Sequence, residues 1–217
     1  MITTHSGDIL SEVPTDSIVR LNNENGSIKT HEFKKASISK DDKRQFDYKI
    51  RNDRGSLLFA RCWILGEGQT EDTIIPHAVQ LLGYDIEQLG ILVIGFQEGL
   101  SIEPAIIIAK TFGIQCAVIT DNDTSGKSFC IKAKKHIKEQ YVFAMSEKAI
   151  EEYLCYNGFL KVYEKLKSEQ EWEKRKVSTD ASDYPTKIAE SLSLSKNFER
   201  HLNRRILMPI RERFSIE

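Results

Sequence analysis

The chain has 217 residues, of which 40% are hydrophobic and 29% are charged, a composition typical of a soluble globular protein rather than a disordered one. Its 31 Lys and Arg residues nearly balance 32 Asp and Glu residues, so the net charge of −1 excludes a histone-like polycation but leaves room for a local basic groove. The longest run without Asp, Glu, Lys or Arg, from Thr73 to Tyr84, is shorter than the about 18 residues of a membrane-spanning helix. With no signal-peptide pattern at the start of the chain, we expect a cytoplasmic protein without a membrane partner.

Four cysteines, Cys62, Cys116, Cys130 and Cys155, occur without any C-x-x-C spacing. A structural zinc site needs such paired ligands. We therefore expect most of them to be buried small hydrophobic residues of a reduced, cytosolic protein.

Residues 22–56 are polar and charged, and Asn25-Gly26 within them predicts a tight turn between strands at 17–21 and 27–32. From residue 57 onward, short apolar strands alternate with helices. The predicted strands are 62–65, 91–94, 115–120 and 141–144, and the predicted helices are 71–82, 104–112 and 128–138. After residue 146 only helices are expected, over 147–176 and, as two helices, over 186–213. This order predicts an α/β fold with a mainly parallel sheet flanked by helices.

Acidic residues follow the first and third of these predicted strands. Glu67 and Glu71 flank a glycine-containing turn, and Asp121 and Asp123 come directly after the strand at 115–120. Because functional groups collect at the carboxyl ends of parallel strands, these carboxylates should meet at one edge, where a cation would offset their repulsion. Oxygen ligands alone suit Mg²⁺ or Mn²⁺ rather than zinc.

A purely structural interpretation of each acidic motif stays open. Glu71 and Asp72 would complement the dipole of the following helix, with Thr70 as its N-cap. The Asp121-Asn122-Asp123 segment would be an ordinary turn. The occurrence of both motifs at the ends of two strands favours the metal site.

The motifs Glu67-Gly68-Gln69-Thr70-Glu71 and Asp121-Asn122-Asp123, about fifty residues apart, resemble the Toprim domain of topoisomerases, bacterial primases and several nucleases. The segment from Leu58-Phe59-Ala60 to Gly90-Ile91 further resembles the OLD family (overcoming lysogenization defect), in which an ABC-type ATPase domain precedes a Toprim nuclease. The resemblance covers roughly residues 57–155. The glycine-rich stretch that the family has after the second strand is altered here to Gly95-Phe96-Gln97-Glu98-Gly99.

The resemblance implies further site residues. Glu151, in a segment similar to the Leu-Glu motif after the fourth strand, would join the metal ligands, although a solvated helix face is the alternative. Lys187 is the best match to the family's late lysine that approaches the scissile phosphate. One metal ion would be held by Glu67 and Glu71 with Asp121, and the second by Asp123 and Glu151. Among the basic residues of the C-terminal region, we favour a later set as the contact surface for the nucleic-acid backbone: Arg200, Arg204, Arg205, Arg211 and Arg213.

The first residues, Ile2-Thr3-Thr4-His5-Ser6, resemble the end of an ABC-type ATPase, in which His5 would be the histidine that senses the γ-phosphate. Gly126-Lys127-Ser128 is not a Walker A loop, because Asp121 stands where the first glycine is required. The expected division is thus the end of an ATPase domain and a linker (1–56), a Toprim catalytic core (57–155) and a helical C-terminal part of the nuclease region (156–217). ATP would be a cofactor of a longer protein only.

The resemblance implies a nuclease that hydrolyses phosphodiester bonds of DNA with two divalent ions, Mg²⁺ or Mn²⁺. Its partners would be DNA and the preceding ATPase domain; RNA as substrate and a homodimer of the longer protein stay open. The alternatives are a catalytically inactive regulatory or dimerisation Toprim module, or a Toprim enzyme of the primase or topoisomerase type. The sequence does not distinguish nicking, double-strand cutting and exonuclease action.

Overall fold

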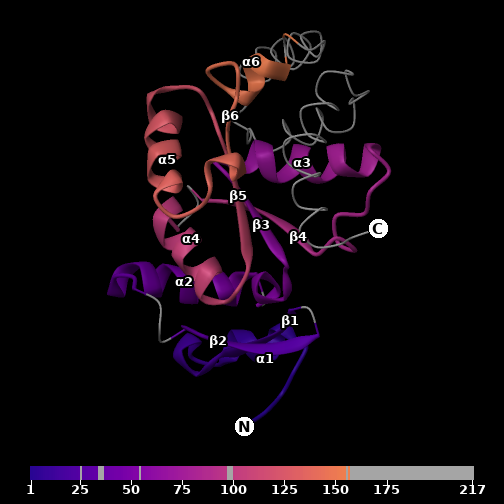
Figure 1. Cartoon of the computed structure of the whole chain (residues 1–217), viewed down its shortest axis with the longest axis vertical. Coiled ribbons are helices and arrows are strands. Elements are labelled where there is room, and N and C mark those ends of the chain that lie inside the picture. Colours follow the sequence, from indigo (N-terminus) through magenta and orange to yellow (C-terminus); the bar gives the residue numbers. More distant parts are fainter. Residues whose placement is uncertain (25, 34–36, 54, 97–99, 155, 157–217) are drawn as a thin grey trace, which may run out of the picture.

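A four-stranded parallel sheet forms the centre of the molecule (Figure 1). The computed structural model describes residues 1–24, 26–33, 37–53, 55–96, 100–154 and 156. The strands lie in the order β4-β3-β5-β6, and every neighbouring pair is parallel. Their bounds are Cys62–Gly66 (β3), Ile91–Gly95 (β4), Gln115–Thr120 (β5) and Val142–Ala144 (β6). The predicted α/β fold and its four strands are confirmed.

Four helices accompany the sheet: α3 (Gln69–Leu81), α4 (Ile102–Thr111), α5 (Thr124–Lys134) and α6 (Ile150–Leu154). Helix α3 ends before Gly83, which has a φ of 83°, as the sequence predicts. Helix α5 begins four residues before the predicted start, because the carboxylate of Asp123 caps it by accepting from the amide of Gly126. None of the helices in the described part of the chain is long and apolar enough to span a membrane.

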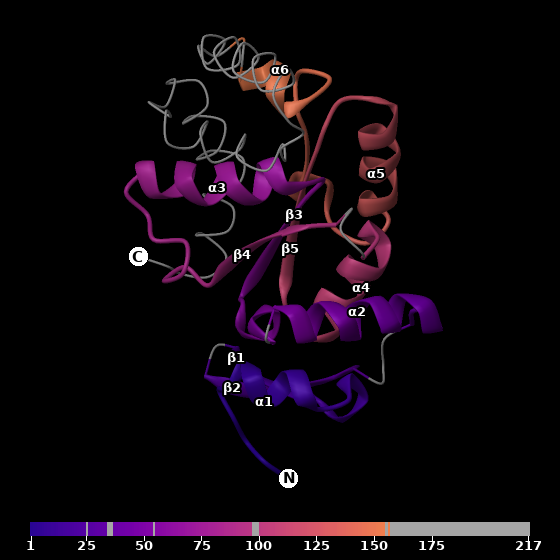
Figure 2. The same ribbon diagram turned by 180° about the vertical axis from the view of Figure 1, so that it is seen from behind.

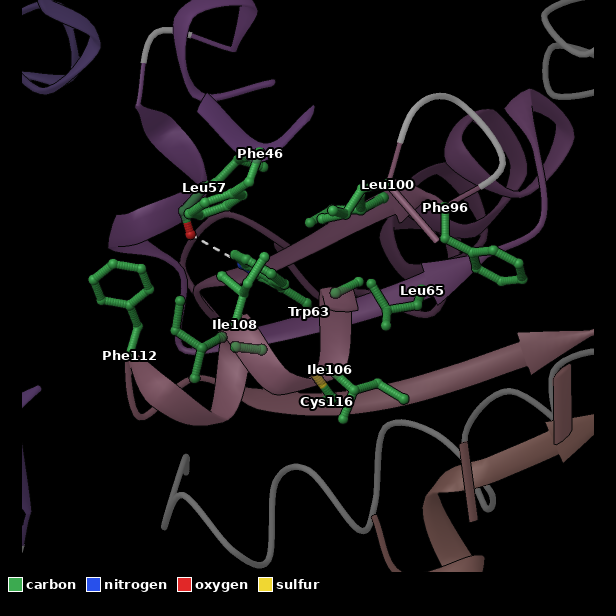
Figure 3. Packing of buried hydrophobic residues seen from close by; sticks show 14 of the residues in the cluster. Phe46, Leu57, Trp63, Leu65, Phe96, Leu100, Ile106, Ile108, Phe112 and Cys116 are labelled. Carbon is green, nitrogen blue, oxygen red and sulfur yellow. Dashed lines mark hydrogen bonds between the residues drawn. The ribbon is translucent and has the colours of Figure 1, made fainter. Parts of the chain in front are cut away.

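Successive side chains of a strand point to opposite faces of the sheet, so the hydrophobic core consists of two clusters, one on each face. In β3, Cys62 and Ile64 pack in a cluster with residues of α3 and α6. Trp63 and Leu65 point to the other face and pack in a second cluster with α4 (Figure 3). All five residues of β3 are buried, as expected for a parallel strand covered on both faces.

The N-terminal part consists of α1 (Gly7–Glu12), a 3₁₀ turn η1 (Thr15–Ser17), an antiparallel hairpin of β1 (Val19–Glu24) and β2 (Ser27–Glu32), helix α2 (Lys40–Asn52) and a second 3₁₀ turn η3 (Ser56–Phe59). The predicted hairpin is present, with Gly26 at a φ of 81°. Helix α2 was not predicted from the sequence. Only Phe46 and Ile50 of its residues are buried, so its apolar stripe is too narrow to stand out in a charged segment.

Helix α2 lies between the hairpin and the sheet in both views (Figures 1 and 2). Phe33 after the hairpin stacks on Phe46 of α2 and on Phe112 after α4, with ring centroids 5.5 and 5.7 Å apart. Arg20 of β1 donates to the carbonyl oxygens of Leu58, Ala60 and Phe112. Residues on either side of position 56 therefore share one core, and the domain boundary there stays a prediction.

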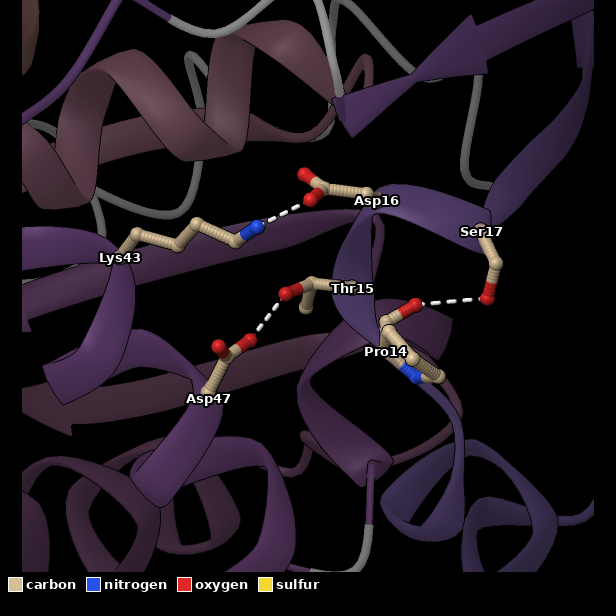
Figure 4. Close-up of polar contacts among 6 residues, drawn as sticks. All are labelled: Pro14, Thr15, Asp16, Ser17, Lys43 and Asp47. Atoms are coloured by element: carbon tan, nitrogen blue, oxygen red, sulfur yellow. Dashed lines mark hydrogen bonds and ion pairs between the residues drawn. The ribbon is translucent and has the colours of Figure 1, made fainter. Parts of the chain in front are cut away.

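Two side-chain contacts fasten the η1 turn to α2 (Figure 4). The hydroxyl of Thr15 donates to a carboxylate oxygen of Asp47, and the ammonium of Lys43 forms an ion pair with Asp16. Thr15 is buried. These contacts fix the chain just before it enters β1.

Cys62, Cys116 and Cys130 are free thiols, and Cys155 lies outside the described residues. Burial raises the pKa of Cys62 to about 12 and raises that of Cys116 well above its usual range. Both thiols are therefore protonated and unreactive at neutral pH, in agreement with their expected packing role.

Candidate metal-binding acidic site

The carboxyl ends of β3 and β5 lie side by side, because these two strands pair directly with Leu65 opposite Val118. Glu67 follows β3 and is only 8% exposed. Its Oε1 accepts a hydrogen bond of 2.8 Å from the backbone amide of Asp121, which follows β5. The predicted meeting of the first and third strand ends is thus observed in the structure.

Glu71 lies in the first turn of α3 and folds back over the preceding loop. It is 3% exposed, and its Oε2 accepts from the amide of Gly68 at 3.0 Å. A Cβ atom on Gly66 would lie 2.6 Å from the Cβ of Glu71, so this close packing requires glycine at position 66. Gly68 is the N-cap residue of α3, and the alternative that placed Thr70 there is wrong.

The carboxylates of Asp121 and Asp123 accept hydrogen bonds from different elements. Asp121 Oδ1 accepts from the amide of Ile150, the first residue of α6, at 3.0 Å. Asp123 Oδ1 accepts from the amide of Gly126 at 2.7 Å. Asp121 and Asp123 are two residues apart, a spacing that predicts side chains on one side of an extended strand, but β5 ends at Thr120 and both lie beyond it. Asp121 thereby connects the end of β5 to the start of α6 at this edge.

Gly126 brings the start of α5 against the acidic residues, and the sequence analysis did not identify this role. A Cβ at this position would lie 2.0 Å from the backbone oxygen of Asp121 and 3.0 Å from Oε1 of Glu67. Its signal in the sequence is a glycine three residues after Asp123, near the start of a helix, which alone is weak evidence.

We predict that Gly126→Ala displaces the Asp121 backbone, because the added methyl group would meet backbone atoms that cannot rotate away. The loss of stability should be about 1–3 kcal/mol, the usual cost of overpacking. Chemical denaturation of the variant and of Gly83→Ala gives the comparison. Gly83 has open space around its Cβ position but a positive φ, so it reports backbone strain alone. A smaller loss for Gly126→Ala than for Gly83→Ala would contradict the packing argument.

Asp72 is a second residue of this edge that the sequence analysis treated only as a helix-dipole contact. Its Oδ2 accepts from the amide of Gly95 at the end of β4, at 3.2 Å. The amide of Phe96 donates to the oxygen of Gly66 at 3.0 Å. Together these bonds fasten the end of β4 to the turn that carries Glu67.

The structure does not show the side chains of the other expected site residues at this edge. Glu151 belongs to α6 and directly follows Ile150, but its side chain lies outside the described part of the structure. His5 is exposed, and its ring centroid is 6.5 Å from that of Phe59. Lys187 and the later arginines lie outside the described residues: Arg200, Arg204, Arg205, Arg211 and Arg213.

The donor chemistry of this edge fits a hard divalent cation. Four carboxylates stand on the turns after β3 and β5, and oxygen atoms are the ligands preferred by Mg²⁺ and Mn²⁺. Each carboxylate has two oxygens with about four acceptor positions, so one backbone hydrogen bond does not exhaust it. Among the described residues, however, no three His, Cys, Asp or Glu side chains are grouped closely enough to hold an ion.

A parallel sheet with acidic residues after two adjacent strands is the arrangement of a Toprim-like α/β domain. Residues 58–123 match the family model of the TOPRIM domain of overcoming lysogenization defect protein-like proteins. This match contains Glu67, Glu71, Asp121 and Asp123. The chain therefore carries an OLD-like Toprim domain, and the expected family resemblance is confirmed. Residues 1–57 match a family described only as a protein of unknown function, DUF2813.

Solved structures support the same fold. The C-terminal region of the Xanthomonas campestris pv. campestris OLD protein, phased with platinum, is 20% identical with a TM-score of 0.53, covering 74% of this chain and 99% of that one. The same region phased with mercury is 22% identical with a TM-score of 0.52, covering 72% and 97%.

Among curated proteins, the chain is similar to the uncharacterized protein YbjD of Escherichia coli (strain K12). The two are 30% identical over 171 residues, or 76% of this chain. The chain spans 31% of that relative's length.

Proposed function

We propose that this chain is the nuclease part of an OLD-type protein and hydrolyses phosphodiester bonds of DNA with the help of divalent metal ions. The observation that carries the proposal is the contact between Glu67 and Asp121, which unites the acidic ends of β3 and β5 within the OLD-like Toprim domain. In the alternative, a catalytically inactive module, these carboxylates would serve only their structural hydrogen bonds to backbone amides.

In this proposal Glu67, Glu71 and Asp121 hold one ion, and Asp123 and Glu151 hold the second. When bound, such a pair of ions activates a water molecule and stabilises the leaving oxygen of the phosphodiester. The carboxylates serve as ionised ligands, so none of them is assigned as the only general base. Lys187 is proposed to stabilise the negative charge that develops on the phosphate.

The backbone contacts of the described residues give these side chains fixed positions. The Gly68 amide holds one oxygen of Glu71, and the Asp121 amide holds one oxygen of Glu67. These bonds restrict the orientations of the two side chains, which lowers the conformational entropy that they would lose on binding an ion.

We further propose that residues 1–56 are the end of an ABC-type ATPase domain, with His5 as its nucleotide-sensing histidine. Two matches meet at residues 57 and 58, where the predicted boundary lies, which supports a change of module there. In this proposal, the ATPase domain is part of a longer protein and ATP is the cofactor of that longer protein. The greater length of the relative is consistent with this.

The proposal is tested by incubating the purified chain with supercoiled plasmid and with linear duplex in Mg²⁺, Mn²⁺, Ca²⁺ or EDTA. We expect cleavage with Mg²⁺ or Mn²⁺ and none in EDTA. Nicked, linear and shortened products distinguish the modes of cutting. Full cleavage in EDTA would exclude the metal-dependent mechanism, and no cleavage with any ion would favour the inactive module.

A further inference from the structure

The outer side of α5 carries an unusual concentration of positive charge. Residues 124–138 include five lysines and no aspartate or glutamate, in a chain whose net charge is −1. Exposed positions recur every three or four residues along this helix, which is the spacing of one helical face. Ser125, Glu139 and Gln140 are exposed as well but do not continue this spacing or charge. The α5 stripe, as we call it, consists of the helical positions and the two exposed lysines just after the helix: Thr124, Lys127, Ser128, Ile131, Lys134, Lys135 and Lys138.

The α5 stripe differs from the ordinary charged surface of this protein. Along α2, acidic and basic residues alternate, as in Lys40-Asp41-Asp42-Lys43-Arg44, and Arg44 lies 3.7 Å from Asp41. A mixed surface of this kind keeps a helix solvated and creates little net field. The α5 stripe has no such internal compensation.

Neighbouring elements neutralise only part of the stripe. Lys134 is bound to Glu139 at 2.6 Å, a contact that raises the pKa of this lysine. Lys135 lies 3.9 Å from Glu103 on α4, and an exposed pair at this distance contributes little. Within the described part of the chain, neither Lys127 nor Lys138 has an ion pair.

The stripe begins at the acidic edge, the edge of the sheet near which Glu67, Glu71, Asp121 and Asp123 lie. Its helix is capped by Asp123, and Lys127 directly follows Gly126, which packs against the Asp121 backbone. Helix α5 packs on β5 and β6 and stands at the side of the molecule in both views (Figures 1 and 2). From Lys127 to Lys134 the helix rises about 10 Å, at about 1.5 Å per residue. This length corresponds to about three phosphates of one strand of a duplex, at about 3.4 Å each along its axis.

We propose that the α5 stripe binds the phosphate backbone of duplex DNA and leads it to the acidic edge. The inference rests on the proposed nuclease function and names the surface that receives its substrate. Lysine ammonium groups neutralise phosphates without reading base sequence, so the contact is independent of sequence. The hydroxyl groups of Thr124 and Ser128, exposed at the start of the stripe, add neutral donors of the kind that commonly contact phosphates.

The test compares two triple variants with the same change of net charge. The first, Lys127→Gln with Lys135→Gln and Lys138→Gln, removes the two lysines of the stripe without an ion pair in the described part of the chain and the weakly paired Lys135. The control, Lys40→Gln with Arg44→Gln and Arg51→Gln, removes exposed charges from α2, which packs beside the residues that precede β3. Fluorescence anisotropy measures binding to a labelled duplex of arbitrary sequence in EDTA, at several salt concentrations.

We expect the α5 variant to bind the duplex roughly ten- to thirtyfold more weakly at low salt, with a salt dependence about two to three units shallower, because each lost contact releases fewer counterions. The control should stay close to the wild type. Equal losses in both variants, or an α5 variant that binds duplex as the wild type does, would overturn the proposal.

The two proposals fail in different ways. Binding in EDTA does not depend on whether the acidic edge cleaves the duplex. A wild-type chain that binds DNA through the α5 stripe but cleaves nothing with Mg²⁺ or Mn²⁺ would contradict the nuclease and keep the binding surface. A chain that cleaves while the α5 variant retains full affinity would contradict the binding surface and keep the nuclease.

Discussion

Glu67→Gln will lower metal-dependent cleavage by about a thousandfold. A metal ligand of a phosphodiesterase contributes to charge stabilisation worth several kcal/mol in the transition state, and about 4 kcal/mol corresponds to this factor. The amide oxygen of the glutamine can still accept from the Asp121 amide, so the bond that joins the two strand ends is kept. Initial rates of plasmid cleavage at saturating Mn²⁺ measure the effect.

Glu87→Gln is the matched control for this variant. Glu87 is exposed in the segment between α3 and β4, and the substitution makes the same change of charge away from the acidic edge. Its activity should equal that of the wild type. The proposed role of Glu67 is wrong if Glu67→Gln cleaves as fast as Glu87→Gln while both variants melt at the wild-type temperature.

Trp63→Ala will destabilise the fold more than any other single change considered in this protein. The side chain is 1% exposed in the cluster beside α4, and its Nε1–H donates to the Leu57 oxygen at 2.9 Å (Figure 3). Truncating a buried tryptophan to alanine costs about 3–5 kcal/mol. For a chain of this size that corresponds to a fall in melting temperature of about 6–20 °C, measurable by calorimetry.

Two further variants separate packing from the hydrogen bond. Trp63→Phe keeps most of the buried ring but leaves the Leu57 oxygen without this donor, so its loss should be smaller. Phe59→Ala removes an aromatic ring that is 42% exposed in the neighbouring η3 turn, and should change stability by far less. A Trp63→Ala chain as stable as Phe59→Ala would show that the core does not depend on this residue.

The sheet could be predicted from the sequence because its two central strands are buried on both faces. Strands β3 and β5 are continuous apolar runs, and helices of the right length separate the strands. The side-by-side position of Glu67 and Asp121 followed from the rule that parallel strands share one carboxyl edge. Local chemistry was thus sufficient for the fold class and for the edge at which the acids meet.

Other features depend on tertiary contacts that no local pattern shows. Helix α2 is fixed by two buried side chains, Phe46 and Ile50, which pack against residues distant in the sequence. The need for glycine at positions 66 and 126 arises from the geometry of two loop-to-helix turns, in which Glu71 and Asp121 lie five residues away, and at position 126 also from the distant Glu67. These constraints involve the acidic edge itself, where packing is closest.

The structural and catalytic interpretations of the acidic motifs prove compatible rather than exclusive. Asp123 caps α5, and Glu71 accepts from the N-cap amide of α3. A side chain that begins a helix is held in one orientation by that helix, which gives a ligand a defined position. The capping bonds therefore do not weaken the proposal that the same carboxylates bind metal ions.

The central claim, that the acids after β3 and β5 form one metal site, is tested most directly by titrating Mn²⁺ into the purified chain and following free Mn²⁺ by electron paramagnetic resonance. We predict saturable binding of up to two ions per chain, markedly weakened in Glu67→Gln and in Asp121→Asn and unchanged in Glu87→Gln. Saturable binding that both acidic-edge variants retain at full affinity, or no saturable binding by the wild type, would contradict it.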